Sequence, residues 1–432
     1  MKSVTLSSTR SGLNALLPPR APLTRLPQCK RFHSIVVGAG YTGLGAARRL
    51  AELLPDEEIF VLEASEVGEG ASGRNSGFLG LNPSQPEANA NGTARDDALR
   101  KIRIQTAGLD LLRSLVTRHG IDCDWDEMAP RICGAATAGG ERSARGARES
   151  LQSWGLRCME LSGEDLKEII GTDYYRYGYQ PLKHALVQPA ALVRGLAESL
   201  PANVTLLERN AVEAIEGASP FVVKTSRGDF EADKVFVANN ANARELGLLN
   251  DRLFAVYTYG ALTPELDDDE LQRLGTTRAW GVHPPTAIGT TMRKMLRRFL
   301  IRSGYSYENE SSDLAKVRAS LEQLYRNRFP GMRSYDLEHV WGGAICMTYN
   351  RQFYFGEPRR GLFAAVGCGG GGVVRGSIHG KLLAEMACGS QSELLSDRLA
   401  LSGPSWIPPE PFRRIGAATS MAWGRWRAGR EC

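Results

Sequence analysis

The strongest constraint on the fold is a glycine-rich turn between a short apolar strand and a helix near the N-terminus. Residues 34–38 (SIVVG) are typical of a buried strand, and residues 38–43 (GAGYTG) follow with the spacing G-x-G-x-x-G. In such a turn the first glycine permits the bend, the second lets a phosphate approach, and the third lets helix and strand pack closely. A helix over 41–54 and a strand over 59–63 complete the unit. This βαβ unit predicts a Rossmann-type α/β domain that binds a dinucleotide.

An acid at the end of the second predicted strand strengthens this interpretation. Glu63 lies twenty residues after Gly43, where a carboxylate accepts hydrogen bonds from ribose hydroxyls. The alternative is a glycine-rich turn beside a surface Glu, which the combination of strand, spacing and acid disfavours. The unit alone does not distinguish NAD from FAD.

Two further glycine-rich segments favour FAD. Residues 70–77 (GASGRNSG) follow the second strand and place Ser, Arg and Asn donors between glycines, which suits a phosphate and a bound ring system. A nicotinamide-binding domain does not need such a loop; a flexible surface loop is the alternative. Residues 367–372 (GCGGGG) lie between a predicted strand, 362–366, and a predicted helix, 373–388. The N-terminus of that helix would stabilise negative charge on a reduced flavin. Gly376 and Gly380 inside it indicate close packing.

The charge distribution argues against a nucleic-acid partner. The net charge is +5, but residues 1–34 hold six basic residues and no acid, and residues 411–432 hold five Arg and one acid. When both ends are subtracted from the 53 basic and 48 acidic residues of the chain, the body over 35–410 has a balance of −5. This body lacks the positive excess expected of a polyanion-binding protein.

The N-terminal segment, 1–33, allows two interpretations. It is rich in Arg, Ser, Thr and Leu and free of acid, as in a mitochondrial transit peptide, and a disordered basic tail has the same composition. Prolines argue against a helix there, so folded structure is expected to begin at Ser34. No apolar run approaches the roughly 20 residues of a membrane span. The eight cysteines include no Cys-x-x-Cys pair, and the six histidines have no metal-ligand spacing. A soluble intracellular protein is expected, cytoplasmic or in the mitochondrial matrix, with no metal.

The rest of the chain reads as alternating strands and helices with no repeat. Helices are expected at 98–119, 190–200, 240–249 and 313–328, and strands at 204–207, 221–225, 234–238, 254–262, 298–303 and 339–346. The C-terminal segment over 403–432 contains four prolines and is expected to be irregular.

Together these motifs resemble the FAD-dependent amino-acid and amine oxidases, the D-amino-acid oxidase-like family, and within it most the gamma-glutamylputrescine oxidase-like amine oxidases. The likeness rests on residues 36–44, 62–64 and 70–77. It continues through 121–125 (IDCDW), 341–343 (WGG) and 412–426. The resemblance implies a discontinuous FAD domain (34–80, 188–250, 355–395) and a mainly antiparallel substrate domain (81–187, 251–354). A tail (1–33) and a C-terminal extension (396–432) flank them.

The resemblance also implies which residues meet non-covalent FAD and what reaction follows. The cofactor-binding set is Gly38, Ala39, Gly40, Tyr41, Thr42, Gly43, Glu63, Ala64, Ser72, Gly73, Arg74, Asn75, Ser76, Gly77, Val212, Gly369, Gly370, Gly371, Gly372 and Val373. The implied activity is oxidation of the C–N bond of an amine or amino acid to an imine by hydride transfer to flavin, with O₂ reduced to H₂O₂.

The sequence departs from many relatives in two places. Gly371 stands where they carry His, and Gln352-Phe353 follow Arg351 where a Pro is usual. Cys346 lies near the position of a covalent flavin link in some sarcosine oxidases but is expected to be a core residue. These departures keep open an FAD dehydrogenase or monooxygenase, or a catalytically silent subunit. The substrate-cavity candidates are Arg302, which could pair a carboxylate, Arg375, and the aromatic residues Tyr257, Tyr259 and Trp341.

Overall fold

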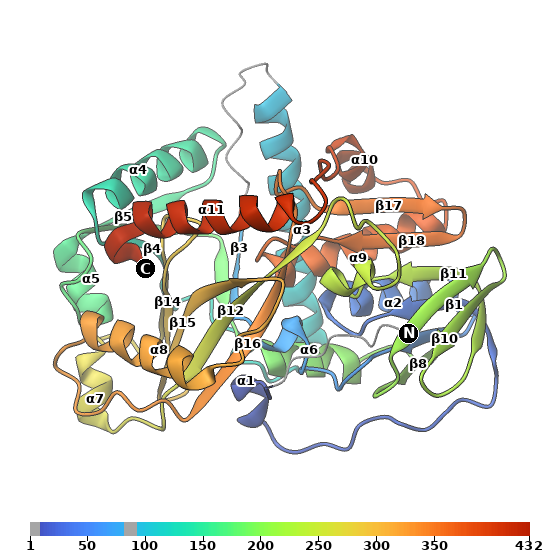
Figure 1. Cartoon of the computed structure of the whole chain (residues 1–432), viewed down its shortest axis with the longest axis horizontal. Helices are drawn as coiled ribbons and strands as arrows, with labels where there is room; N and C mark the ends of the chain where they lie inside the picture. Colours follow the sequence, from blue (N-terminus) through green and yellow to red (C-terminus); the bar gives the residue numbers. More distant parts are fainter. Residues whose placement is uncertain (1–8, 82–92) are drawn as a thin grey trace.

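The computed structural model describes residues 9–81 and 93–432, which are built around two eight-stranded sheets (Figure 1). The first sheet has the order β17 (Tyr354–Arg359), β18 (Leu362–Val366), β11 (Phe230–Val237), β1 (Arg31–Val37), β2 (Ile59–Leu62), β8 (Val204–Leu207). Its four central pairings are parallel, and β17 is antiparallel to β18. β10 (Phe221–Thr225) extends from β11 and pairs with β9 (Val212–Gly217). This is the predicted Rossmann-type sheet.

Helices α2 (Tyr41–Leu53), α9 (Gly372–Ala387), α3 (Thr93–His119) and α6 (Pro189–Glu198) share one hydrophobic core with this sheet. α2 and α9 pack closely because α9 carries glycines at the contact. A Cβ on Gly380 would lie 2.0 Å from the carbonyl oxygen of Thr42, and one on Gly376 would lie 2.8 Å from its Oγ1. The close-packing role predicted for these two glycines is confirmed.

The second sheet is antiparallel except for its β13–β4 pair. Its order is β16 (His339–Met347), β12 (Phe254–Leu262), β15 (Arg298–Tyr307), β14 (Thr291–Met295), β13 (Trp280–His283), β4 (Arg131–Ala135), β6 (Tyr177–Pro181), β5 (Cys158–Ser162). A two-stranded sheet pairs β3 (Phe78–Gly80) with β7 (His184–Leu186). One face of the large sheet packs in the main core with α8 (Leu314–Arg328) and residues near α7 (Asp268–Arg273). Its other face is turned toward the nucleotide-type domain.

The N-terminal segment is part of the fold, which corrects the expectation that structure begins at Ser34. Strand β1 already starts at Arg31, and α1 (Gly12–Ala15) forms despite the nearby prolines, which all follow it. Leu13 is 0% exposed and packs with Trp341, Leu262 and Leu300 of the second sheet. The segment then returns below the molecule to β1 (Figure 1), held by an ion pair from Arg20 to buried Glu208. Residues 1–8 lie outside the described part.

The C-terminal residues also differ from the expectation of irregular structure. α10 (Glu393–Ala400) and α11 (Phe412–Ala428) form there, and α11 crosses the edge of the second sheet (Figure 1). The four prolines precede α11 instead of interrupting it, and proline is tolerated at a helix start. The predicted helix over 240–249 is instead the 3₁₀ turn η2 (Asn240–Arg244) followed by turns. The remaining helices are α4 (Ala138–Ser153), α5 (Gly163–Ile170), η1 (Ala71–Gly73) and η3 (Gly429–Glu431). Within residues 9–81 and 93–432, none of the helices combines the length and the apolar character of a membrane span.

Candidate functional site

A cavity of about 2620 Å³ lies between the two large sheets. The first turn of α2, the segments after β2 and β11, and the glycine loop before α9 line one side. The inner face of the second sheet lines the other, and α11 forms part of the roof. The first side is therefore built from the segments whose sequence motifs pointed to a dinucleotide.

The start of α2 has the geometry of a phosphate site. Gly38 has φ +101°, which favours glycine, and a Cβ on Gly43 would lie 1.8 Å from the carbonyl oxygen of Gly38. A Cβ on Gly40 would come within 2.8 Å of Ser72 Oγ, so the loop and the helix start approach closely. The N-cap residue of α2 is Gly40, which has no side chain that could cap the helix. Residues 38–42 line the cavity, so the positive end of the α2 dipole lies at its wall.

Glu63 is oriented by the backbone around it. Its Oε2 accepts a hydrogen bond from the N–H of Ala39 at 2.9 Å and its Oε1 one from the N–H of Ser65 at 3.0 Å. Burial raises the pKa of Glu63, although these backbone donors act in the opposite direction. Each carboxylate oxygen retains a lone pair for a further donor, so Glu63 can also bind two ribose hydroxyls.

The loop over residues 70–77 divides into cavity-lining and packing residues. Ser72, Asn75 and Ser76 line the cavity, and Ser72 Oγ accepts from the N–H of Tyr41 at 3.2 Å. Gly73 and Gly77 do not line the cavity but allow close packing. A Cβ on Gly73 would lie 2.0 Å from the carbonyl oxygen of Gly68, and one on Gly77 would lie 2.0 Å from that of Val187. Asn75 shapes the loop by donating to the carbonyl of Ser72 at 2.7 Å and accepting from the N–H of Gly77.

Arg74 also lines the cavity, but its guanidinium is engaged by acceptors of the protein itself. It donates to the backbone carbonyls of Glu69 at 2.6 Å and Gly342 at 2.9 Å, and it pairs with the Glu69 carboxylate at 3.2 Å. Burial lowers the pKa of Arg74, against the raising effect of Glu69. Its role is to connect the loop to strand β16 across the two domains.

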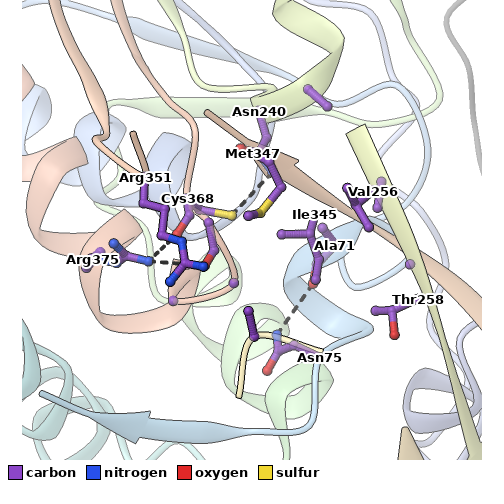
Figure 2. A pocket seen from close by; sticks show the side chains of 18 of the residues that line it. Ala71, Asn75, Asn240, Val256, Thr258, Ile345, Met347, Arg351, Cys368 and Arg375 are labelled. Atoms are coloured by element: carbon purple, nitrogen blue, oxygen red, sulfur yellow. Dashed lines mark hydrogen bonds between the residues drawn. The ribbon is translucent and has the colours of Figure 1, made fainter. Parts of the chain in front are cut away.

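Arg375 folds back over the late glycine loop. It donates to the carbonyl of Cys368, and Figure 2 shows it beside Arg351 and Cys368 on one side of the pocket. A Cβ on Gly371 would lie 2.6 Å from Nη2 of Arg375, so the glycine that replaces the relatives' His leaves room for this guanidinium. Gly369, Gly370, Gly371, Gly372 and Val373 all line the cavity, and the N-cap residue of α9 offers no side-chain hydrogen bond.

The cysteines near this loop have different environments. Cys346 is 0% exposed in the main core and burial raises its pKa, so the prediction of a core cysteine is confirmed. Cys368 lines the cavity instead, and its Sγ accepts from Nδ2 of Asn240 at 3.5 Å (Figure 2).

The second sheet presents Arg302 to the cavity between two hydroxyls. Its guanidinium donates to Thr291 Oγ1 at 2.9 Å and to Thr258 Oγ1 at 3.3 Å. Alternation along β12 and β16 turns Val256, Thr258 and Ile345 toward the cavity, as Figure 2 shows.

The same alternation corrects the expected aromatic walls. Tyr259 and Trp341 do not line the cavity. Tyr259 lies in the main core, where its hydroxyl contacts Ser306 Oγ at 2.7 Å, and Trp341 packs with Leu13. Tyr257 reaches the cavity lining but is largely buried in the core. Cavity residues that sequence reasoning missed are Lys101, Arg131, His283, Thr258 and Thr291. No motif marked them, because the pairing of distant strands and, for Lys101, the packing of helix α3 bring them to the cavity.

Comparison with known proteins identifies the family. The DAO family, described as FAD dependent oxidoreductase, matches residues 33–386. The chain belongs to the DAO family of FAD-dependent oxidoreductases. Among curated members, the "Probable oxidoreductase OrdL" of Rhizobium meliloti (strain 1021) is 25% identical over 429 residues, covering 97% of each chain. The "Gamma-glutamylputrescine oxidoreductase" of Escherichia coli (strain K12) is 26% identical over 383 residues, covering 85% of this chain and 86% of the relative.

A solved structure shows the same fold. The glycine oxidase from Geobacillus kaustophilus superposes with a TM-score of 0.70 at 20% identity, covering 84% of this chain and 96% of that chain. The residues present also fit the family's cofactor. At the start of α2, a Cβ on Gly40 would fill space that a phosphate needs, and one on Gly43 would meet the carbonyl oxygen of Gly38. The carboxylate of Glu63 is placed where a ribose would bind. The N-terminus of a second helix, α9, faces the same cavity. Val212 and Ala64 line it as well.

Proposed function

We propose that this FAD-dependent oxidoreductase oxidises the C–N bond of an amine or amino acid to an imine and uses O₂ as its electron acceptor. The observation that carries the proposal is the position of Arg302, a carboxylate-binding side chain, in the cavity shared with the nucleotide cradle. The relatives named for gamma-glutamylputrescine and glycine point to the same class of substrate.

The chain's own residues would bind and orient the cofactor. The first turn of α2 would supply N–H groups for the pyrophosphate, Glu63 would accept from the adenosine ribose, and Val212 would meet the adenine. Ser72, Asn75 and Ser76 would line the pyrophosphate and the flavin, and residues 369–373 would meet the flavin. Bound FAD would supply the redox chemistry, which is acceptance of a hydride from the carbon next to nitrogen and transfer of two electrons to O₂ to give H₂O₂.

The substrate side requires orientation and a low dielectric more than an acid or a base. Arg302 is held by Thr258 and Thr291, so its guanidinium is preorganised for the two oxygens of a carboxylate. The hydride would leave from the carbon next to a neutral amine nitrogen, and a cavity rich in cations disfavours the ammonium form. Arg375 and the N-terminus of α9 supply positive potential beside the flavin position. Water then hydrolyses the released imine.

The test is spectroscopic, on the full chain purified with FAD. We expect a yellow protein that a panel of amines and amino acids bleaches under anaerobic conditions, and that regains its colour in air with one H₂O₂ formed per turnover. An Arg302→Lys variant should raise KM for amino acids more than for amines without a carboxylate, because Lys cannot form the bidentate pair.

Three outcomes would contradict parts of the proposal. Bleaching without recovery in air would replace O₂ by another electron acceptor. A yellow protein that no amine bleaches would remove the substrate assignment. A folded protein that cannot be loaded with FAD would be a catalytically silent relative.

A further inference from the structure

Seven strands of the second large sheet carry positive charge without an acidic residue, and Glu160 lies on the remaining edge strand, β5. Strands β4, β6 and β12–β16 contain no Asp or Glu, and Arg131, Arg293 and Arg302 occupy three of them. Arg293 is satisfied in part, since it donates to the carbonyls of Ser76 and Val187. Arg302 donates to two hydroxyls. Arg131 alone of the three has no partner in the described chain.

Arg131 is a buried cation without a hydrogen bond or an ion pair among the described residues. It is 6% exposed, it lines the cavity, and its Nε is a buried donor with no acceptor. A Cβ on Gly80 would lie 3.1 Å from the guanidinium carbon, so β3 holds this side chain in place. A buried Nε–H without an acceptor is costly, and a ligand bound in the cavity could supply the missing acceptor.

The acids that line the cavity within the described ranges belong to other elements and are engaged elsewhere. Glu63 accepts hydrogen bonds from the backbone N–H groups of Ala39 and Ser65. Glu431 accepts hydrogen bonds from those of Ala136 and Thr137. The other three pair with arginines: Glu66 with Arg209, Glu69 with Arg74, and Asp97 with Arg100. Burial lowers the pKa of Arg131, and no carboxylate acts against it.

The lowered pKa of His283 reflects its burial and the positive charge of the arginines around it. It lies on β13, which pairs on one side with β4 and on the other with β14. Its Nε2 is buried without a partner and its Nδ1 contacts the carbonyl of Pro284 at 3.2 Å. Burial, followed by Arg131 and later Arg302, lowers the pKa of His283 to about 3. Both arginines therefore act on the same part of the cavity.

We propose that Arg131 is a second anion-binding group of the substrate cavity, and that the substrate is an amino compound with an acidic group besides the carboxylate that Arg302 binds. This inference rests on the proposed function, because it assigns the far end of the same substrate. β4 and β15 are three strand spacings apart, about 14 Å between their backbones. Long arginine side chains that reach inward from both strands can share one flexible dicarboxylate.

The experiment measures binding apart from turnover. Isothermal titration calorimetry of the FAD-loaded protein compares dicarboxylates with monocarboxylates of equal chain length: malonate with propionate, succinate with butyrate, glutarate with pentanoate, and adipate with hexanoate. We expect at least one dicarboxylate to bind tenfold or more tightly than its matched monocarboxylate. Arg131→Met should reduce that preference to less than threefold without changing monocarboxylate affinity, and Arg131→Lys should restore part of it.

A second readout keeps the proposal testable if one variant folds poorly. Removing a buried, unpartnered cation should leave the Tm without ligand unchanged or raised in Arg131→Met, while the rise in Tm caused by the dicarboxylate disappears. Equal affinity for both members of every pair in the wild-type protein would overturn the proposal. So would an Arg131→Met variant that loses FAD or binds monocarboxylates equally less well, because Arg131 would then serve the cofactor or the fold.

The outcome is separable from that of the proposed function. Dicarboxylate binding without bleaching by any amine would leave the anion site intact and remove the oxidase assignment. Bleaching by glutamine and glutamate alike, without selective dicarboxylate binding, would do the reverse.

Discussion

Gln188 donates a hydrogen bond from its Nε2 to the backbone carbonyl of Leu13 at 2.7 Å. The same side chain accepts from the N–H groups of Ala190 and Ala191 and so caps α6. The N-terminal segment is thereby joined to a helix that lies far along the sequence. Thr9 and Arg10 of this segment line the cavity, so the segment forms part of the candidate site.

We therefore expect Leu13→Ala to destabilise the protein by about 2–5 kcal/mol, the range for truncation of a fully buried leucine. Leu23→Ala is the matched control, since Leu23 is 52% exposed and lies in the same segment. Urea unfolding monitored by tryptophan fluorescence measures both. Equal and small losses for the two variants would show that the segment does not contribute to stability.

Glu63→Gln tests the nucleotide cradle. Loss of a charged acceptor for ribose hydroxyls should weaken FAD binding by about 10- to 100-fold, because hydrogen bonds to charged groups contribute about 1.5–3 kcal/mol. Titration of apoprotein with FAD, followed by flavin fluorescence, measures the Kd. Glu58→Gln, on an exposed residue before β2, should leave it unchanged. Similar Kd values for the wild type and both variants would remove Glu63 from the site.

Glu431→Gln tests how helix α11, which covers part of the cavity, is held in place. Glu431 is 3% exposed, and its Oε1 accepts from the N–H groups of Ala136 and Thr137 and from Thr137 Oγ1 at 3.0 Å. We expect a loss of about 1–3 kcal/mol of stability and faster proteolysis within α11. Glu149→Gln, on the exposed face of α4, is the control. Unchanged cleavage of α11 would contradict this anchoring role.

The pH dependence of stability should reflect His283. Its folded pKa is about 3 and its unfolded pKa about 6.5, so below pH 6.5 the unfolded chain takes up a proton that the folded protein does not. Stability is therefore full above pH 6.5 and falls as the pH decreases toward 3, by at most about 1.4 kcal/mol per pH unit for this residue. His283→Gln should flatten the curve between pH 6.5 and 4, whereas His339→Gln should not. Urea midpoints at several pH values give the measurement, and parallel curves for wild type and His283→Gln would contradict it.

Gly43→Ala tests the close approach in the phosphate turn. A Cβ there would lie 1.8 Å from the Gly38 carbonyl oxygen, so the turn must open, and we expect loss of FAD together with a lower Tm. Gly416→Ala in α11 meets nothing within 4 Å and should stabilise the protein by up to about 1 kcal/mol. Bound flavin after gel filtration and thermal unfolding distinguish the two. Retention of FAD in Gly43→Ala would refute the packing role.

Local patterns predicted which segments of the first domain line the cavity, while the contacts of these residues with FAD stay a prediction. Residues 38–42, Glu63 and most of the two later glycine loops line one cavity as expected, because each follows a strand of the same parallel sheet and its chemistry is local to the turn. The substrate half was predicted only in part. Arg302 faces the cavity, but Trp341 and Tyr259 face the cores, since a strand's period of two does not say which face is inside.

The sequence by itself determined the Rossmann-type unit, because G-x-G-x-x-G, its strand and its acid act within about 30 contiguous residues. The two later glycine-rich segments, 70–77 and 367–372, added the preference for FAD and the resemblance to the family. Only the tertiary structure decided that the N-terminal segment is part of the core and that Arg74 is a structural link. It also decided that Arg131, His283 and Arg302 line one cavity from strands that carry no acidic residue. These features depend on contacts between residues far apart in the sequence, and burial and charge compensation exist only once the strands that carry them have paired.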